Sequence, residues 1–276
     1  MPTIGLSTFA LGPHAKPHEV LEFALQQGFR GMELGSYSLW PPEIDGAGRK
    51  HIRSLAAAHG LDLSIHFIHR AVAPASHNPE RRALHRDELE QTIEIAHDIG
   101  ARVVVIHPGP IDYPGVAPDQ APESVRQEAL ENLRGFLQET APKAEEAGVV
   151  ICVENMHHNP GQVIQKYTDL LNLVEAVSSP AVQITLDVGH ADRADGITDA
   201  LDTFAPYLRH IHMHDSNGVR DHLEIGQGKL DFSQWVEKWR DYPFMMVLES
   251  RSESDPHNSV VRSRDRLKDV LGPTVR

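Results

Sequence analysis

Histidines and carboxylates recur in this sequence at one kind of position, directly after a short apolar run rich in β-branched residues. Runs of this composition are typical of buried β-strands. Imidazole and carboxylate are also the side chains that bind Mn²⁺, Mg²⁺, Co²⁺ or Zn²⁺, so the pattern indicates a metal site if the strand ends meet. The residues that end these runs are His66, His107, Glu154, Asp187, His212 and Glu249.

The segments that must position these residues alternate between strand-like and helix-like patterns along the whole chain. We expect strands at about residues 3–7, 31–34, 61–66, 102–107, 149–154, 182–187, 210–214 and 245–249. We expect helices at about residues 17–27, 48–59, 79–99, 123–147, 162–177, 198–204, 232–240 and 258–270. This alternation predicts an α/β fold, a closed parallel (β/α)8 TIM barrel, in which working residues lie at the carboxyl ends of the strands.

Length and local signals agree with that fold. The chain has 276 residues and a barrel of this kind needs about 250, so we expect a single domain over residues 1–276. Gly60, Gly100 and Gly148 each stand where a helix should end and a strand begin, as expected of helix C-caps.

Composition limits the partners and the cellular location that we expect for the protein. The formal net charge of −13 argues against a surface built mainly to bind nucleic-acid phosphates. Cys152 is the single cysteine, so an intrachain disulfide is excluded. The first residues lack the features of a signal peptide, and no apolar run reaches the roughly 18 residues that a membrane helix needs. We therefore expect a cytoplasmic protein with no membrane partner.

Strand parity tests whether the ligands can share one pocket, because side chains on a strand alternate between two faces. If Glu154 points into the barrel, Cys152 does as well, and Ile151 and Val153 then face the helices. We expect Cys152 to be a buried structural thiol, since no basic residue flanks it to lower its pKa.

The run HIHMH places three histidines on one face of the seventh strand, namely His210, His212 and His214. We choose His212 for the pocket, and His210 could be a buried, hydrogen-bonded histidine lower in the barrel. Ile211 and Met213 then face the helices.

A central metal site is the first chemical prediction. Glu154, Asp187, His212 and Glu249 end four consecutive strands. Three carboxylates crowded together without a cation would repel one another, and some would have to bind protons. A bound divalent metal resolves that conflict. Salt bridges to Arg or Lys are the alternative, but no basic residue stands at an equivalent strand end.

Further histidines could extend this site to two or three ions. His66 and His107 could complete a second site with Glu154 as a bridge, or they could bind substrate or be structural. His190, in DVGH, and His222, in RDHLEIGQG, could hold a third ion or contact a polar substrate. We therefore expect one to three divalent ions.

Other residues are candidates for contact with the substrate. Trp40, beside two prolines after the second strand, could form a wall of the pocket, and Lys229 could reach its rim. Glu33, in GMELG, could touch the substrate or form a structural salt bridge. The GQG sequence before Lys229 is too short to identify a phosphate-binding loop.

Five motifs in order resemble the xylose-isomerase-like barrel superfamily. They are IHPGP, VENM, LDVGHAD, HIHMHDSNG with the following DHLEIGQGKLDF, and VLES. That superfamily includes sugar and sugar-phosphate isomerases, ketose 3-epimerases, inosose-processing enzymes and endonuclease IV. The resemblance extends from the third strand to the eighth, is specific for the superfamily and leaves the reaction open.

The ketose-epimerase pattern within the superfamily implies a single metal ion held by Glu154, Asp187, His212 and Glu249. It also implies that Glu154 and Glu249 act as acid/base groups on opposite faces of the substrate. His190 would contact substrate oxygens.

The endonuclease IV pattern implies the same four ligands and a second zinc at His66 and His107. It places a third zinc on His190 and His222, together with an aspartate two residues before His222. This sequence has Arg220 at that position, and Asp221 is adjacent. The chain is therefore intermediate between the two patterns.

We weigh two functions. The first is a divalent-metal-dependent isomerase or epimerase of a sugar, sugar phosphate or polyol, in which the metal stabilises an enediolate-like charge and glutamates transfer the proton. The alternative is an endonuclease IV-type zinc-dependent phosphodiesterase acting on abasic-site DNA, with nucleic acid as its partner. The acidic net charge and the DVGHA and GQG loops favour a small polyhydroxy substrate. Other chemistry at the same site, such as dehydration of a cyclic polyol, and loss of activity stay open. The resemblance also suggests a homo-oligomer.

Overall fold

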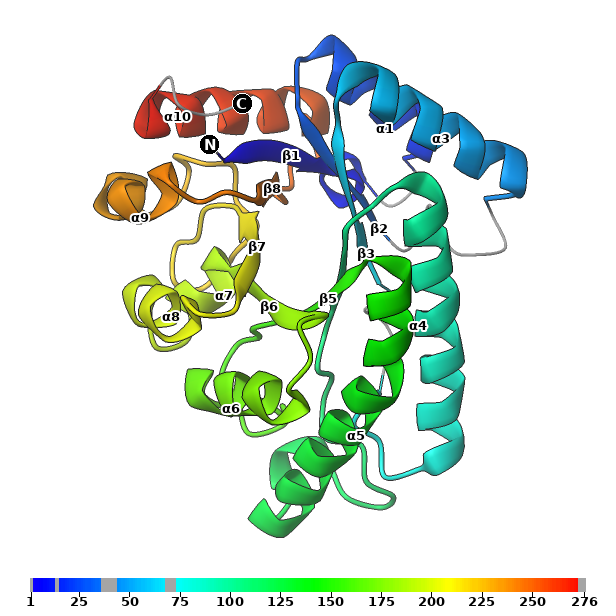
Figure 1. The fold of residues 1–276 in the computed structure, drawn as a ribbon. Helices are drawn as coiled ribbons and strands as arrows, with labels where there is room; N and C mark the ends of the chain where they lie inside the picture. The colour runs from blue at the N-terminus through cyan, green and yellow to red at the C-terminus, as the bar shows by residue number, and fades with distance from the viewer. Residues whose placement is uncertain (1, 13–14, 36–43, 68–72, 273–276) are drawn as a thin grey trace.

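The strands close into a parallel barrel in sequence order, as the computed structural model shows (Figure 1). The structure describes residues 2–12, 15–35, 44–67 and 73–272. Pairing of β1 with β8, with Thr3 opposite Met245, completes the ring. The strands are β1 (Thr3–Ser7), β2 (Gly31–Gly35), β3 (Asp62–His66), β4 (Val103–Ile106), β5 (Val150–Glu154), β6 (Val182–Asp187), β7 (Leu208–Met213) and β8 (Met245–Leu248).

Helices surround this barrel, so the predicted (β/α)8 fold is confirmed (Figure 1). The α-helices are α1 (Pro17–Gln26), α3 (Gly46–His59), α4 (Pro79–Ile99), α5 (Glu123–Ala147), α6 (Tyr167–Val177), α7 (Val188–Asp192), α8 (Ile197–Phe204), α9 (Val236–Arg240) and α10 (Pro256–Leu271). Short 3-10 helices are η1 (Thr8–Leu11), η2 (Pro118–Gln120) and η3 (Phe232–Trp235). Within the described ranges, no helix combines the length and apolarity that crossing a membrane would need.

Local capping sets the helix boundaries. Helices α3, α4 and α5 end at Gly60, Gly100 and Gly148, which adopt left-handed conformations with φ of 62°, 84° and 66°. Such a conformation favours glycine, so the predicted helix ends are confirmed. The helix expected from residue 162 is wrong at its start. It begins at Tyr167, because the Asp169 carboxylate accepts hydrogen bonds from the backbone N–H groups of Gln165 and Lys166 and so caps the helix there.

The barrel interior confirms the predicted parity of β5. Cys152 packs with Val103 and Val105 in a small cluster inside the barrel. Ile151 and Val153 belong instead to the large core between the strands and the helices. Burial raises the pKa of the Cys152 thiol to about 12, which agrees with a structural role.

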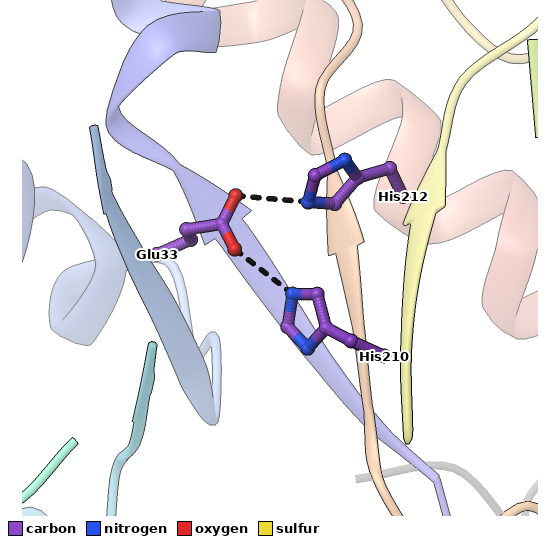
Figure 2. Close-up of side chains that lie close together, drawn as sticks. All are labelled: Glu33, His210 and His212. Atoms are coloured by element: carbon purple, nitrogen blue, oxygen red, sulfur yellow. Dashed lines mark hydrogen bonds and ion pairs between the residues drawn. The ribbon is translucent and has the colours of Figure 1, made fainter. Parts of the chain in front are cut away.

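A group of polar side chains also lies inside the barrel (Figure 2). Glu33 on β2 faces His210 and His212 on β7, and all three side chains are completely buried. Ile211 and Met213 on the same strand join the outer core, as the parity predicts. Burial of a carboxylate is costly unless it is paired, so this layer depends on its internal contacts.

Candidate metal centre

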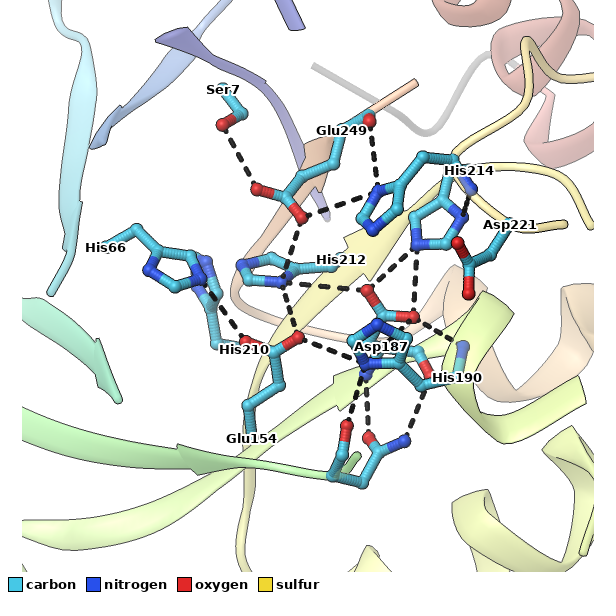
Figure 3. A network of polar contacts seen from close by, with 12 residues as sticks. Ser7, His66, Glu154, Asp187, His190, His210, His212, His214, Asp221 and Glu249 are labelled. Atoms are coloured by element: carbon cyan, nitrogen blue, oxygen red, sulfur yellow. Dashed lines mark hydrogen bonds and ion pairs between the residues drawn. The ribbon is translucent and has the colours of Figure 1, made fainter. Parts of the chain in front are cut away.

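His212 lies at the centre of a cluster of carboxylates at the carboxyl end of the barrel (Figure 3). Its Nδ1 is 3.5 Å from Glu154 Oε1, 3.5 Å from Glu249 Oε2 and 3.9 Å from Asp187 Oδ2. Figure 3 shows Glu154 and Glu249 on either side of the His212 ring. All four side chains are buried, so the structure brings together the four residues chosen for the central site.

This donor set fits a divalent cation. Atoms that share one ion at about 2.1 Å lie roughly 3–3.5 Å from one another, close to the separations around His212 Nδ1. That nitrogen is buried and hydrogen-bonds to no residue within the described ranges. An unsatisfied buried ligand atom facing three carboxylates is the arrangement that a bound cation would complete.

Electrostatics in the cluster lead to the same conclusion. Burial opposes ionisation of Glu154, but the imidazoles of His107 and His212 outweigh it and hold its pKa well below the usual range. Burial likewise opposes charge on His212, yet Glu249 and Glu33 raise its pKa well above the ordinary value. Without an ion, the carboxylates are therefore balanced by protonated histidine, and a divalent cation could supply the same charge.

Asp187 has two structural tasks besides that of a candidate ligand. Its Oδ1 accepts a 2.7 Å hydrogen bond from the backbone N–H of His190 and so caps α7. Its Oδ2 lies 2.8 Å from His214 Nε2. Burial opposes ionisation of Asp187, but His190 and His214 outweigh it and depress its pKa. The Asn155 side chain bonds both the N–H and the carbonyl of Asp187, which fixes the end of β6.

His66 and His107 form what we call the β3–β4 flank of the cluster. Their Nε2 atoms lie 3.4 Å and 3.1 Å from Glu154 Oε2, which hydrogen-bonds to no described residue. His66 Nδ1 donates a 2.8 Å hydrogen bond to the carbonyl of Phe67, so Nε2 is the nitrogen presented to an ion. Burial opposes the charged form of His66, but Glu154 raises its pKa to about 9. These residues fit a second ion bridged by Glu154.

His157, Arg193 and Asp221 form what we call the α7 flank, on the other side of the cluster. Asp221 Oδ2 lies 2.7 Å from His157 Nε2 and 2.6 Å from an Arg193 guanidinium nitrogen. Burial raises the pKa of Asp221, but both partners lower it and keep the carboxylate charged. His157 stacks edge-on against His190, with ring centroids 4.4 Å apart. A guanidinium thus already supplies positive charge to Asp221. The two histidines predicted for a third ion, His190 and His222, lie instead beside Asp187, and the ligand atoms of these three residues are within 4.8 Å of one another.

The loop after β7 is organised by a buried carboxylate. Asp215 accepts hydrogen bonds from the backbone N–H groups of Gly226, Gly228 and Leu230, at 2.8, 3.0 and 3.1 Å. A Cβ on Gly228 would lie 2.2 Å from Asp215 Oδ1, so glycine is required there. The GQG sequence therefore wraps a side chain of the protein itself, and this wrapping positions the loop that carries His222.

A cavity of about 200 Å³ opens onto the cluster. Arg251, which was not among the predicted residues, lies at its edge with its guanidinium carbon 3.7 Å from the centre of the Phe9 ring. Lys229 is outside the lining, and its amine is 3.0 Å from Asp192 Oδ1. Trp40 lies outside the described residues. The lining residues are Phe9, Gly35, His66, His107, Glu154, Met156, His190, His222, Glu249 and Arg251.

His157 and Arg193 are parts of this site that the sequence motifs do not identify, and His214, which shares a strand face with His212, also contacts the cluster. His157 follows VENM directly, and Arg193 follows LDVGHAD, so both lie just beyond motifs that were recognised. Position next to these motifs is the available signal for His157 and Arg193, and strand parity is the signal for His214. Their roles depend on contacts with Asp221 and Asp187, which the sequence does not show.

Comparison with known proteins places the chain in a family. The model of the family described as xylose isomerase-like TIM barrel matches residues 21–270. The chain belongs to this family, as the motifs indicated.

Several relatives and a solved structure resemble the chain. It is 29% identical over 276 residues to the uncharacterized protein MJ1311 of Methanocaldococcus jannaschii, covering 97% of this chain and 88% of that one. Identity is 23% to L-ribulose-5-phosphate 3-epimerase UlaE of Shigella boydii, over 72% of this chain and 68% of that one. It is 24% to a probable endonuclease 4 of Mycoplasma pneumoniae, over 74% of each chain. The crystal structure of a D-tagatose 3-epimerase-like protein superposes with a TM-score of 0.82 and 25% identity, over 98% of this chain and 97% of that one.

Proposed function

We propose that this protein is a divalent-metal-dependent epimerase or isomerase of a sugar, sugar phosphate or related polyol. The observation that carries the proposal is the convergence of Glu154, Asp187, Glu249 and His212 Nδ1 beneath a small cavity. Its volume is below the roughly 300 Å³ at which pockets for drug-sized ligands begin, which suits a small polyhydroxy compound. Similarity to an L-ribulose-5-phosphate 3-epimerase and a D-tagatose 3-epimerase-like protein supports the same substrate class.

Glu154, Asp187, His212 and Glu249 would hold the ion. A divalent cation bound there would supply Lewis-acid stabilisation of negative charge on substrate oxygens. Inversion at a carbon beside a carbonyl needs one base to remove a proton and a second group to return one on the opposite face. Glu154 and Glu249 flank His212 from two sides, which suits these roles (Figure 3). Ser7 donates a 3.2 Å hydrogen bond to Glu249 Oε1 and orients that carboxylate.

His190 and His222 would bind the substrate hydroxyl groups, since both line the cavity. His190 Nδ1 donates to the carbonyl of Asn155 at 3.0 Å, which leaves Nε2 to face a ligand. We keep Trp40 and Lys229 as proposed substrate contacts. We also propose that the protein works as a homo-oligomer in the cytoplasm.

A zinc-dependent phosphodiesterase acting on abasic-site DNA is the second candidate. The β3–β4 flank favours it, because His66 and His107 present Nε2 atoms to the oxygen of Glu154 that a second ion would share. Similarity to a probable endonuclease 4 adds support. The Arg193–Asp221 pair and the net charge of −13 favour the epimerase instead.

The deciding experiment combines metal analysis with two assays. Ketoses and ketose phosphates are incubated with the protein in D₂O, with Mn²⁺, Co²⁺, Mg²⁺ or Zn²⁺, and followed by NMR. Epimerisation by proton removal and return predicts deuterium at the inverted carbon, loss of turnover with a chelator and recovery on adding metal. Cleavage of abasic-site DNA without turnover of any ketose would reject the epimerase proposal in favour of the nuclease.

A further inference from the structure

Both ring nitrogens of the candidate metal ligand His212 face carboxylates. Its Nδ1 faces the cluster, and its Nε2 lies 3.1 Å from Glu33 Oε1 (Figure 2). The other oxygen of Glu33 lies 2.9 Å from His210 Nε2 and accepts a 3.0 Å hydrogen bond from Ser64 Oγ. Glu33 Oε2 is therefore held by His210 on β7 and Ser64 on β3. Oε1 meets His212 Nε2 at ion-pair distance, and neither atom has a hydrogen-bond partner among the described residues.

Glu33 is not among the described residues that line the cavity, so we do not expect it to contact a substrate. Its side chain is completely buried, and the cavity is lined by other residues. Within the described ranges, its side-chain contact with the cluster is the one to His212. Of the two roles expected for Glu33 from the sequence, the structure shows the salt bridge, and its partners are His210 and His212.

Chemistry gives this contact a consequence for metal binding. A neutral imidazole carries one proton, and only the other nitrogen can bind a metal. A carboxylate facing Nε2 favours the proton on that nitrogen, which leaves the lone pair of Nδ1 directed at the three carboxylates. Such an acceptor also makes the ligand nitrogen more basic.

We propose that Glu33 is the positioning residue of the metal centre, holding His212 as the Nε2–H tautomer so that Nδ1 binds the ion. The proposal rests on the metal centre of the proposed function and is independent of which substrate is turned over. His210 and Ser64 hold the carboxylate of Glu33 in place from the other side.

Replacement of Glu33 by Gln tests the proposal, because Gln keeps the size of the side chain and removes the charge. We expect the dissociation constant for Zn²⁺ or Mn²⁺ to rise about 10–100-fold in E33Q. The matched control is E88Q, which breaks another pair between a glutamate and a buried histidine, Glu88 Oε2 with His85 Nδ1 at 2.9 Å on α4. E88Q should bind metal as the unmodified protein does.

A measurement on the unmodified protein makes the test independent of how E33Q folds. In the zinc-loaded protein, ¹⁵N NMR should show His212 bound through Nδ1 with a slowly exchanging proton on Nε2. Zinc bound through Nε2, or a folded E33Q with unchanged affinity, would overturn the role of Glu33 alone. An unmodified protein that binds no divalent ion would overturn the metal centre itself, and with it this role.

Discussion

The two flanks of the central cluster use the same types of ligand and are held together differently. On the β3–β4 flank, the Nε2 atoms of His66 and His107 lie 3.4 Å and 3.1 Å from Glu154 Oε2. On the α7 flank, Asp221 is contacted by the guanidinium of Arg193 at 2.6 Å. On the β3–β4 flank, Glu154 raises the pKa of His66 to about 9, whereas burial lowers the pKa of His107, so positive charge comes from the imidazole of His66. On the α7 flank, a permanently charged guanidinium stands beside the imidazole of His157.

This difference shows that suitable ligands are not enough to predict a metal site. Whether a permanently charged side chain already neutralises the carboxylate also decides where an ion is needed. Imidazoles lose their protons readily and can exchange them for a metal. A guanidinium keeps its charge at all ordinary pH values, so its carboxylate partner stays neutralised without an ion. We therefore expect the β3–β4 flank to bind metal and the α7 flank to be closed to it.

The largest effect should come from Glu154, which belongs both to the central site and to the β3–β4 flank. E154Q removes a shared ligand and a proposed acid/base group, so turnover should fall by about 10³-fold. Zinc content, measured by mass spectrometry of the purified protein, should fall as well. The control E175Q changes an exposed glutamate on α6 and should alter neither quantity. Full activity in E154Q would remove this residue from the mechanism.

The next effect should come from the β3–β4 flank itself. In the double variant H66N/H107N we expect about one zinc ion fewer per chain at saturation, because both nitrogen ligands of the second ion are gone. The central ion should bind with little change. H97N, at an exposed histidine on α4, is the control. An unchanged zinc content would assign His66 and His107 to substrate binding or to structure.

Removal of the guanidinium should open the α7 flank. In R193M, the ligand atoms of His157, His190 and Asp221, which lie within 4.8 Å of one another, lose their cationic neighbour. We expect one additional, weakly bound zinc ion in a titration, since the carboxylate then needs a new counter-charge. R134M on α5 removes a partly exposed arginine that pairs with Glu131, and it serves as the control. The same zinc stoichiometry in R193M and the unmodified protein would contradict our account of this flank.

The fold and the central site could be predicted because their signals are local. Apolar runs mark the strands, and glycines mark the ends of α3, α4 and α5. In a parallel barrel all strand ends meet on one face, so a ligand at a strand end is placed by topology alone. The parity of Glu154 and Cys152 follows from the period of the strand and needs no knowledge of distant residues.

Contacts between distant segments could not be predicted. Glu33 and His210 are 177 residues apart in the chain, and they meet only because β2 and β7 face each other across the barrel. Asp221 is 28 residues from Arg193, and their pairing depends on how two loops fold over the strand ends. The start of α6 differs from the prediction for a local reason, because Asp169 caps its first turn.

The smallest effect should come from Asp215, which holds the loop that carries Asp221. Its carboxylate accepts three backbone hydrogen bonds from the segment Gly226–Leu230, and Asn cannot accept them all because its amide presents donors. We expect D215N to lower the free energy of unfolding by about 1–3 kcal/mol, measured by chemical denaturation. D231N, at an exposed helix cap, should cost less, because water can replace its contacts. Since the Asp215 loop carries Asp221 and none of the β3–β4 flank, zinc binding at His66 and His107 should survive in D215N. Loss of that zinc would show that the two flanks are not independent.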